Sequence, residues 1–182
     1  MDALSFRTPV PDDAALLGAL HVAAWRETYA GLLPQVLLES LSIEERAGMW
    51  RAAIEDPAAH HATALFLAES GGSLVGFAAC SDQRDPMLEA RGYDGELGAV
   101  YILQRFQRLG IGRALMRLMA RALLDRGRRA ASLWVLRENQ SARIFYERLG
   151  GVPAGEKSDE LPDVTLHEVA YGWPDLTRLG GP

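Results

Sequence analysis

The sequence of 182 residues contains a single cysteine, Cys80, so no disulfide can form within the chain. It has no apolar run of the roughly 18 residues that a membrane-spanning helix needs. The opening MDALSFRTPVPDD lacks a basic start and an apolar core, so a secretory signal peptide is not expected. These absences favour a reducing, cytoplasmic location. Cys80 follows Phe77, Ala78 and Ala79, and we expect it to be a small buried hydrophobe rather than a nucleophile.

Repeats, low-complexity segments and linkers are also absent from the sequence. A length of 182 residues and a hydrophobic fraction of 48% suit one domain with a sizeable core. We therefore expect a single domain over residues 1–182, in which residues 175–182 form a frayed tail. No motif points to a metal ion, and none is expected.

The net charge of −5 is unevenly distributed along the chain. Residues 105–148 hold eleven Arg and three acidic residues, a net charge of +8, whereas the rest hold eight Lys or Arg and 21 acidic residues, a net charge of −13. A basic segment in an acidic chain suits an anionic small molecule. Arg113, Arg117 and Arg121 recur every four residues and would form a solvated stripe on a helix, with Arg113 nearest such a ligand. Nucleic-acid binding is a weaker interpretation, because the overall charge is negative and no aromatic residues interleave with the basic run.

Hydrophobic periodicity predicts two helices first, and then strands that alternate with helices. Helices are predicted over residues 11–29, 42–55 and 113–126 and from 139 or 141 to 149, with a helical turn at 34–40. Strands are predicted over residues 5–8, 64–68, 74–79, 97–103, 131–136 and 164–171. Segments 81–94 and 155–163 are expected to be polar loops. The order strand, helix, strand after residue 97 implies a right-handed parallel crossover, so we expect one α+β domain with a mixed sheet.

The stretch from Gly95 to Leu115 is the most informative part of the sequence. It begins with an apolar, β-branched run, Leu97 to Leu103, which predicts a buried strand. A short polar segment follows, and Gly110-Ile111-Gly112 then opens a helix. The first N–H groups of a helix lack partners within it and lie at the positive end of its dipole. Because the two glycines have no Cβ, an anion can approach these N–H groups, which predicts a site for phosphate oxygens.

Two well-known phosphate-binding motifs do not match this stretch. A P-loop requires Gly-Lys followed by Ser or Thr, whereas Arg113 and Ala114 follow Gly112. A dinucleotide-binding loop requires a third glycine three residues after the second, and position 115 is Leu. An ordinary buried strand–helix corner with glycines at its turn is the alternative interpretation.

Residues Gln107 to Gly112 resemble the Q/R-x-x-G-x-G/A pyrophosphate-binding loop of the GNAT superfamily, the acyl-CoA-dependent N-acyltransferases. Residues Val100 to Ile102 resemble the strand that precedes this loop in the family. Leu133 to Gly150 resembles the strand and the N-x-x-A-x-x-F/L-Y-x-x-x-G helix of the other half of the GNAT core. Trp25 and Tyr29 match the W-x-x-x-Y pattern of one subgroup. The resemblance covers nearly the whole chain and implies a GNAT-like α+β fold, with a central mixed sheet of six to seven strands flanked by about four helices.

The resemblance also implies how the chain would bind acetyl-CoA. The pyrophosphate would lie on the glycine loop and on the amides of Arg113 and Ala114. The backbone of Val100 and Ile102 would pair with the pantetheine arm, the Ile102 N–H would polarise the thioester carbonyl, and Asn139 would bond the pantetheine or the outer arm. The expected cofactor-binding residues are Val100, Ile102, Gln107, Arg108, Leu109, Gly110, Ile111, Gly112, Arg113, Ala114 and Asn139.

Acetylation of an amine needs a base, because an amine with a pKa of about 10.4 is mostly protonated at neutral pH. Glu96, at the start of the central strand, is the candidate base, and a solvated strand end is its structural alternative. A bulge at Gly95 or Gly98 would shorten its path to an acetyl group at Ile102, but a water relay would still be needed. Tyr146 would lie near the sulfur, where its phenol could protonate the departing thiolate. Its structural alternative is a half-buried helix residue.

Two positions depart from the family pattern. Gln104 stands where the family often has proline, which matters little. Gly151 stands where an aromatic residue is usual, which predicts altered packing beneath the final strands. His21, Trp25 and Tyr29 repeat every four residues and form either an aromatic core stripe or the lining of an acceptor pocket.

The leading hypothesis is an enzyme that transfers an acetyl group from acetyl-CoA to a primary amine of a small molecule, peptide or protein by direct attack. The alternative is an acyl-CoA-binding module that does not cleave the thioester when amines are added. The expected partners are acetyl-CoA and an amine, with no nucleic acid and no membrane. A homodimer is compatible with the sequence. The acceptor is not specified, because the first helices and the loops at 81–94 and 155–163 carry no motif.

Overall fold

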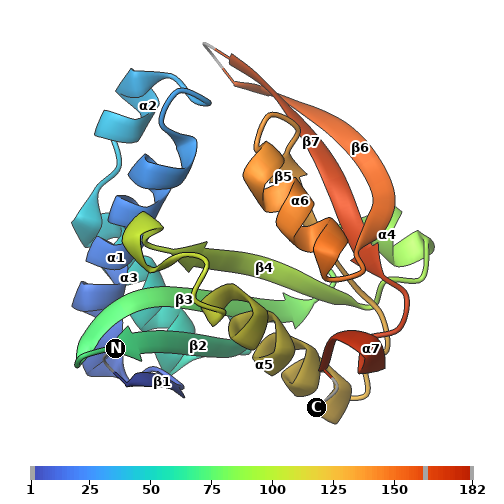
Figure 1. The fold of residues 1–182 in the computed structure, drawn as a ribbon, viewed down its shortest axis with the longest axis horizontal. Helices are drawn as coiled ribbons and strands as arrows, with labels where there is room; N and C mark the ends of the chain where they lie inside the picture. The colour runs from blue at the N-terminus through green and yellow to red at the C-terminus, as the bar shows by residue number, and fades with distance from the viewer. Residues whose placement is uncertain (1–2, 162–163, 181–182) are drawn as a thin grey trace.

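Seven strands form one mixed sheet in the order β1-β2-β3-β4-β5-β7-β6 (Figure 1). The computed structural model describes residues 3–161 and 164–180. Its strands are β1 (Leu4–Arg7), β2 (Ala62–Ser70), β3 (Ser73–Asp82), β4 (Gly95–Ile102), β5 (Ala131–Leu136), β6 (Val152–Leu161) and β7 (Val164–Trp173). Its helices are η1 (Pro11–Asp13), α1 (Ala14–Tyr29), α2 (Gln35–Glu39), α3 (Ile43–Glu55), α4 (Pro86–Ala90), η2 (Gln104–Phe106), α5 (Ile111–Asp125), α6 (Gln140–Arg148) and α7 (Thr177–Gly180). The predicted mixed α+β sheet is confirmed, and α1, α3, α5 and α6 are the long helices around it.

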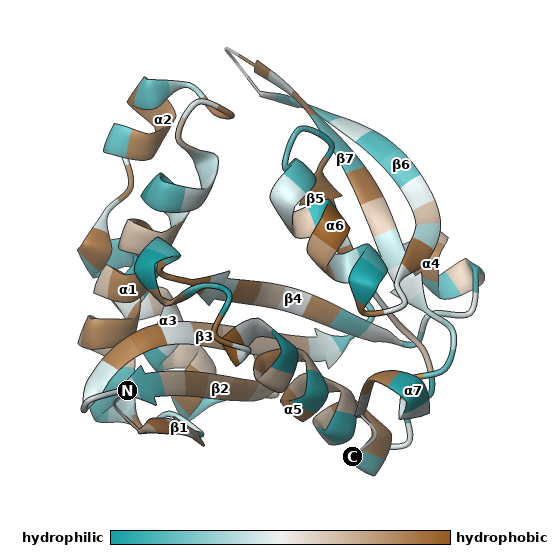
Figure 2. Ribbon diagram, in the orientation of Figure 1, coloured by the Kyte–Doolittle hydropathy of each residue, from teal (hydrophilic) through white to brown (hydrophobic). Residues whose placement is uncertain are grey.

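Helices cover both faces of the sheet. Successive residues of a strand point to opposite faces, and on β3 Ala78 lies in the core that α5 completes while Phe77 lies in the core formed with α1 and α3. Figure 2 shows hydrophobic and hydrophilic residues alternating along α5. Its buried residues are Ile111, Leu115, Met116, Met119, Ala120 and Leu123. Within the described residues, no helix has the length and apolar character needed to cross a membrane.

Cys80 lies in the core beside α5, as the sequence predicted. The residue is 1% exposed, and its thiol donates a weak hydrogen bond to the Met119 carbonyl oxygen (3.8 Å). Burial raises the pKa of this thiol to about 12. The thiol is therefore protonated and inert at neutral pH.

The polar segment 81–94 is not the continuous loop that we expected, because it contains α4. Pro86 occupies the first helical turn, where its missing N–H costs nothing. Asp85 precedes it and accepts hydrogen bonds from the amides of Met87 (2.9 Å) and Leu88 (3.3 Å). This cap starts a five-residue helix within a segment of polar composition.

The C-terminal third is also more regular than the sequence suggested. The acidic loop expected over 155–163 belongs to β6 as far as residue 161, because it pairs with β7; residues 162–163 lie outside the described residues. The tail expected to fray over 175–182 packs onto α5 instead, with Leu176 fully buried and Leu179 5% exposed. Residues 181–182 of that tail are not among those described.

The strands β4 and β5 run parallel, as predicted, but separate soon after they start (Figure 1). They pair only at Gly95 with Ala131 and at Glu96 with Ser132. The opposite edge of β4 stays paired with β3 as far as Ile102. One edge of β4 therefore has no neighbouring strand along most of its length.

A bulge interrupts β4 at Gly98. On β3, the neighbours Ala79 and Cys80 pair with Ala99 and Leu97, so Gly98 is an extra residue on β4. Gly98 itself is exposed. A bulge bends its strand and redirects the residues around it, and this one lies at the level where β4 leaves β5.

Gly151 packs tightly against β7, and packing that differs from the family pattern stays a prediction. A Cβ added to Gly151 would lie 2.8 Å from Trp173 Cζ2 and 3.0 Å from the Tyr146 carbonyl oxygen. The Trp173 indole is held in place because its Nε1–H donates to the Leu149 carbonyl oxygen (2.9 Å). An indole from β7 therefore fills the space that an aromatic residue at position 151 would take.

Gly18 marks a close approach of α1 to α3. A Cβ added there would lie 2.6 Å from the Ala47 amide nitrogen, a backbone atom that cannot move without its helix. We expect Gly18→Ala to lower the free energy of unfolding by roughly 1–3 kcal/mol, because overpacking outweighs a gain in helix propensity of about 1 kcal/mol. Urea unfolding measures this change.

Gly48→Ala is the matched control, because Gly48 lies on α3 with nothing within 4 Å of an added Cβ. This substitution should raise the free energy of unfolding by up to about 1 kcal/mol through helix propensity alone. A stabilising effect of both substitutions would show that α1 and α3 are not in tight contact at Gly18.

Candidate functional site

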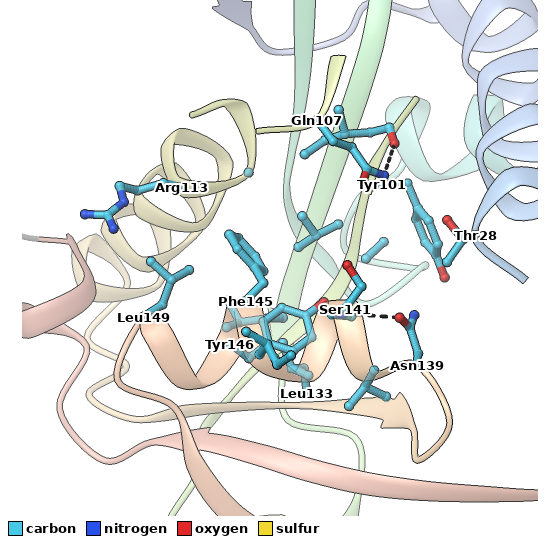
Figure 3. Close-up of a pocket in the computed structure, with 18 of the residues that line it drawn as sticks. Thr28, Tyr101, Gln107, Arg113, Leu133, Asn139, Ser141, Phe145, Tyr146 and Leu149 are labelled. Carbon is cyan, nitrogen blue, oxygen red and sulfur yellow. Dashed lines mark hydrogen bonds between the residues drawn. The ribbon is translucent and has the colours of Figure 1, made fainter. Parts of the chain in front are cut away.

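A cavity of about 540 Å³ opens where β4 and β5 diverge (Figure 3). Its walls come from the end of α1, from β4, from the loop into α5, from β5 and from α6. The expected site residues that line it are Tyr29, Val100, Ile102, Gln107, Arg108, Gly110, Gly112, Arg113, Asn139 and Tyr146. The expected residues that do not line it are His21, Trp25, Glu96, Leu109, Ile111 and Ala114.

The edge of β4 that faces the cavity carries free backbone groups. The Leu103 N–H donates to the Val75 carbonyl oxygen of β3 (2.9 Å). Because successive residues direct their backbone groups to opposite edges of a strand, Val100 and Ile102 direct theirs away from β3. Strand β5 does not pair with them. The N–H groups of Val100 and Ile102 therefore face the cavity, where an extended ligand can bond them as an added strand would.

Gln107 occupies one acceptor on this edge. Its side-chain Nε2 donates to the Ile102 carbonyl oxygen (3.1 Å), a bond drawn in Figure 3. The Ile102 carbonyl oxygen is therefore occupied, and the Ile102 N–H group remains available to a ligand. The Gln107 side chain fixes the start of the loop against β4 instead of extending toward an anion.

The loop into α5 contains two residues with left-handed backbone. Arg108 has a φ of 65° and Gly110, the residue before the helix, has a φ of 85°. The amides of Ile111 and Gly112 belong to the first turn, where the helix has no carbonyl oxygen that could accept from their N–H groups. They are therefore free to bind an anion. Ala114 was expected to contribute its amide, but this N–H donates to the Gly110 carbonyl oxygen (3.0 Å). Of the expected helix amides, that of Ala114 is therefore already used within the helix.

Gly112 has a packing role in addition to its place in the helix start. A Cβ added to it would lie 3.0 Å from Phe145 Cζ and 3.2 Å from Ile102 Cδ1. The glycine therefore lets α5 approach both α6 and β4. Gly110 differs, because nothing lies within 4 Å of its added Cβ, and its positive φ is what favours glycine there.

Positive charge surrounds this end of the cavity. The lining includes Arg108, Arg113 and Arg148, and it lies at the positive end of the α5 dipole. Figure 3 shows the Arg113 side chain directed away from the other labelled side chains. These cations suit a large anion that extends from the helix start to the solvent.

Helix α6 presents Tyr146 to the cavity from the opposite side (Figure 3). The residue is 9% exposed, and its ring packs against Phe145, Tyr171 and Trp173. Its hydroxyl has no hydrogen-bond partner among residues 3–161 and 164–180. Burial raises the pKa of this phenol, so it keeps its proton and can donate it.

Asn139 lies at the start of α6 and also lines the cavity. Its Oδ1 accepts a hydrogen bond from the Ala142 amide (3.2 Å), so the side chain caps the helix. The Nδ2 group is the part that remains for a ligand. Ser141, which we did not predict, lines the cavity one residue after the helix start (Figure 3).

Glu96 lies behind the bulge rather than in the cavity wall. Its carboxylate forms a two-point ion pair with Arg84, in which Arg84 Nε donates to Oε2 (2.9 Å) and Nη2 to Oε1. A Cβ added to Gly98 would lie 3.7 Å from Glu96 Oε1. Because Gly98 lines the cavity, the Glu96 carboxylate is separated from it only by the bulge.

The aromatic stripe on α1 is divided between core and cavity. His21 is 6% exposed, and its Nδ1 accepts a hydrogen bond from Trp50 Nε1 (3.0 Å). Burial lowers the pKa of His21 to about 4, so it is neutral at pH 7. Within the described chain, Trp25 Nε1 and His21 Nε2 are buried without hydrogen-bond partners. Only Tyr29 reaches the cavity, where its hydroxyl lies 2.9 Å from that of Tyr101.

We did not predict Glu27, whose carboxylate is the sole acidic group in the described cavity lining. Its Oε2 accepts a hydrogen bond from the Gln104 amide (2.6 Å), which joins α1 to the end of β4. Its position between Trp25 and Tyr29 in the last turn of α1 was the available signal. Among residues 3–161 and 164–180, no group of His, Cys, Asp or Glu side chains could hold a metal ion.

Comparison with known proteins agrees with this arrangement. The model of the acetyltransferase (GNAT) family matches residues 22–151. An N-acetyltransferase of Bacillus subtilis (strain 168), YuaI, which is called uncharacterized, is 36% identical over 169 residues. That match spans 92% of this chain and 91% of YuaI.

Solved structures share the fold at lower identity. The PaiA N-acetyltransferase of Thermoplasma acidophilum, in complex with coenzyme A, has a TM-score of 0.66 and 18% identity over 94% of this chain and 99% of its own. The yncA protein of Salmonella typhimurium, with its cofactor acetyl-CoA, has a TM-score of 0.67 and 16% identity over 96% of this chain and 95% of its own.

Proposed function

The chain belongs to the GNAT acetyltransferase family, and on this premise we propose that it transfers an acetyl group from acetyl-CoA to a primary amine by direct attack. The observation that carries the proposal is the unpaired edge of β4, which lies between the start of α5 and the hydroxyl of Tyr146. The acceptor is a small molecule or the amine of a peptide or protein.

The cavity has the parts that acetyl-CoA needs. The first amides of α5, together with Arg108 and Arg113, would hold the pyrophosphate. The N–H groups of Val100 and Ile102 would bond the pantetheine arm and the thioester carbonyl. Relatives of this fold solved with coenzyme A and acetyl-CoA support this choice of donor.

The reaction needs three events at this site. The ammonium group of the acceptor loses a proton, and the neutral amine attacks the thioester carbonyl carbon. The negative charge that develops on the carbonyl oxygen is stabilised by a backbone N–H of β4. The carbon–sulfur bond then breaks, and Tyr146 protonates the departing thiolate. The nitrogen gives up its second proton, which returns Tyr146 to its neutral form, so the products are an amide and free coenzyme A.

We favour the Val100 N–H as the donor to the thioester oxygen, because it lies closer than Ile102 to the proposed base Glu96. Four residues of extended strand span about 13 Å, and the bulge at Gly98 shortens that path. One water between the carboxylate and the amine would complete the proton path. Asp94 is a poor substitute, because it accepts hydrogen bonds from backbone amides at residues 129 and 130.

Release of free thiol from acetyl-CoA, measured against a panel of amines, tests the proposed activity. Acetyl-CoA that binds but is not cleaved with any amine in the panel would support the alternative, a binding module without turnover. Mass spectrometry of the product amine identifies the acceptor and shows whether the new bond is an amide.

Charge at position 110 should control acetyl-CoA affinity. Asp and Asn both tolerate a left-handed backbone and have nearly the same volume, and nothing lies within 4 Å of a Cβ at Gly110. We expect Gly110→Asp to bind acetyl-CoA at least about tenfold more weakly than Gly110→Asn, a difference of about 1.4 kcal/mol, because a carboxylate would repel the pyrophosphate. Calorimetry that gives equal affinities would place the phosphate elsewhere.

The hydroxyl of Tyr146 should affect turnover rather than binding. We expect Tyr146→Phe to lower kcat by roughly 10²-fold while acetyl-CoA affinity is nearly kept, because the thiolate loses its proton donor. Tyr171→Phe is the matched control: its hydroxyl bonds Glu147 (2.5 Å) and Arg143 (3.2 Å) and does not line the cavity. Equal kcat values in the two variants, with chemistry limiting the rate, would leave Tyr146 a packing residue.

The pH dependence of kcat/KM separates the two carboxylates near the cavity. If Glu96 takes the proton, Glu96→Gln should depress kcat/KM by roughly 10²-fold or more at low pH, with recovery as the amine deprotonates by itself. Glu27→Gln is the comparison. A profile of wild-type shape for Glu96→Gln, combined with an altered one for Glu27→Gln, would assign the proton transfer to Glu27.

A further inference from the structure

Arg84 lies on the side of the bulge that is opposite the start of α5, in the segment between β3 and α4. Its guanidinium is paired with Glu96 at two points. A Cβ added to Gly98 would lie 3.7 Å from Arg84 Nη2, the same distance as from Glu96 Oε1. Gly98 is exposed and lines the cavity, and Arg84 does not line it, so the guanidinium lies next to a lining residue, just outside the lining.

The ion pair leaves donors of Arg84 unused. A guanidinium has five N–H groups, and Glu96 takes one from Nε and one from Nη2. Within residues 3–161 and 164–180, Nη1 donates no hydrogen bond. The Arg84 side chain is 54% exposed, whereas that of Glu96 is 15% exposed. A second carboxylate can therefore reach Arg84 without displacing Glu96.

The backbone around Arg84 is fixed. Gln83 Oε1 accepts hydrogen bonds from the amides of Arg84 (3.1 Å) and Asp85 (3.0 Å), and Gln83 Nε2 donates to Ser132 Oγ (2.7 Å). Asp85 accepts a hydrogen bond from Nε1 of Trp134 (3.0 Å), a residue that lines the cavity. The segment is thus tied to β5 at two points, which holds Arg84 beside the cavity before any ligand arrives.

The carboxylates at the two ends of this segment, Asp82 and Asp94, have their own partners. Asp82 forms a two-point ion pair with Arg128 (3.0 and 2.9 Å), and Asp94 accepts from the amides of Arg129 and Ala130. Arg84 is therefore the cation of this segment that lies beside the cavity-lining Gly98 with donors to spare.

We propose that Arg84 is the subsite for a carboxylate of the acceptor, so that the acceptor class is an amino acid with its amine close to a carboxylate. The proposal rests on the acetyl transfer proposed above and specifies its acceptor. Two residues of strand, about 7 Å, separate Gly98 from Val100. The carboxylate and the attacking nitrogen of one small α- or β-amino acid fit within that distance. Planar carboxylates suit the parallel N–H groups of a guanidinium.

The subsite also gives Arg84 a part in positioning the amine. A carboxylate on Nη1 and Nη2 shares the charge of Arg84 with Glu96, and it orients the amine toward the bulge. The Glu96 carboxylate then has a less strongly bound oxygen with which to accept the proton. An amine without a carboxylate lacks both effects.

The experiment compares α-amino acids with the corresponding amino amides as acceptors, by free-thiol release from acetyl-CoA. The neighbouring carboxylate makes the amine of the acid the more strongly protonated of the two. A preference for the acid therefore cannot come from a larger fraction of neutral, attacking amine. We expect the wild-type protein to favour at least one acid over its amide by about tenfold or more in kcat/KM.

Variants then assign that preference to a residue. Arg84→Gln should reduce the acid-to-amide ratio of kcat/KM to near one, mainly through a higher KM for the acid. Arg128→Gln is the matched control, because Arg128 forms an equivalent two-point pair with Asp82 but is not among the nearest neighbours of Gly98; it should keep the wild-type ratio. Arg84→Lys should restore part of the preference, since it returns the charge without the planar pair of donors.

The outcomes separate this inference from the proposed function. Turnover of other amines, with acids and amides used equally by the wild-type protein, overturns the carboxylate subsite and leaves acetyl transfer standing. A preference for acids that persists in Arg84→Gln assigns recognition to another residue and also overturns it. Binding of acetyl-CoA without thiol release for any amine overturns both. Thermal unfolding of Arg84→Gln within a few degrees of Arg128→Gln excludes loss of the fold as the cause.

Discussion

The divergence of β4 from β5 is the constraint on which the rest of the structure depends. After two pairs of residues, β4 has no neighbour on one edge. Backbone N–H and C=O groups that are buried without partners cost free energy comparable to a lost hydrogen bond, so such an edge must be open to water or to a ligand. The cavity of about 540 Å³ lies along this edge and is lined by residues of α1, β4, β5, α6 and the loop into α5.

Close packing between α5, α6 and β4 fixes the geometry where β4 and β5 diverge. Gly112 lets α5 contact Phe145 of α6 and Ile102 of β4, and a side chain there would force the three elements apart. Gly151 and Trp173 make a similar fit below α6, which fixes the ring of Tyr146 between Phe145 and Trp173. The two glycines therefore determine where the phenol and the start of α5 lie relative to β4.

The bulge at Gly98 divides the site into two sides with different electrostatics. On the α5 side, arginines and the helix dipole favour a large anion. On the other side, Glu96 and Arg84 form a nearly neutral pair with spare donors on the guanidinium. This separation suits the proposed transfer, because one uniformly positive cavity would repel the ammonium group of an amine acceptor.

The sequence by itself determined the local features: the β4 strand, the glycine-rich start of α5, the α6 helix with Tyr146, and the burial of Cys80. These follow from periodicity, turn chemistry and a motif whose residues are neighbours in the chain. Only the tertiary structure decided that His21 is core while Tyr29 reaches the cavity, and that Arg84 pairs with Glu96. The reason is physical: sheet order, strand divergence and a bulge set which distant side chains meet, and none of these leaves a local pattern in the sequence.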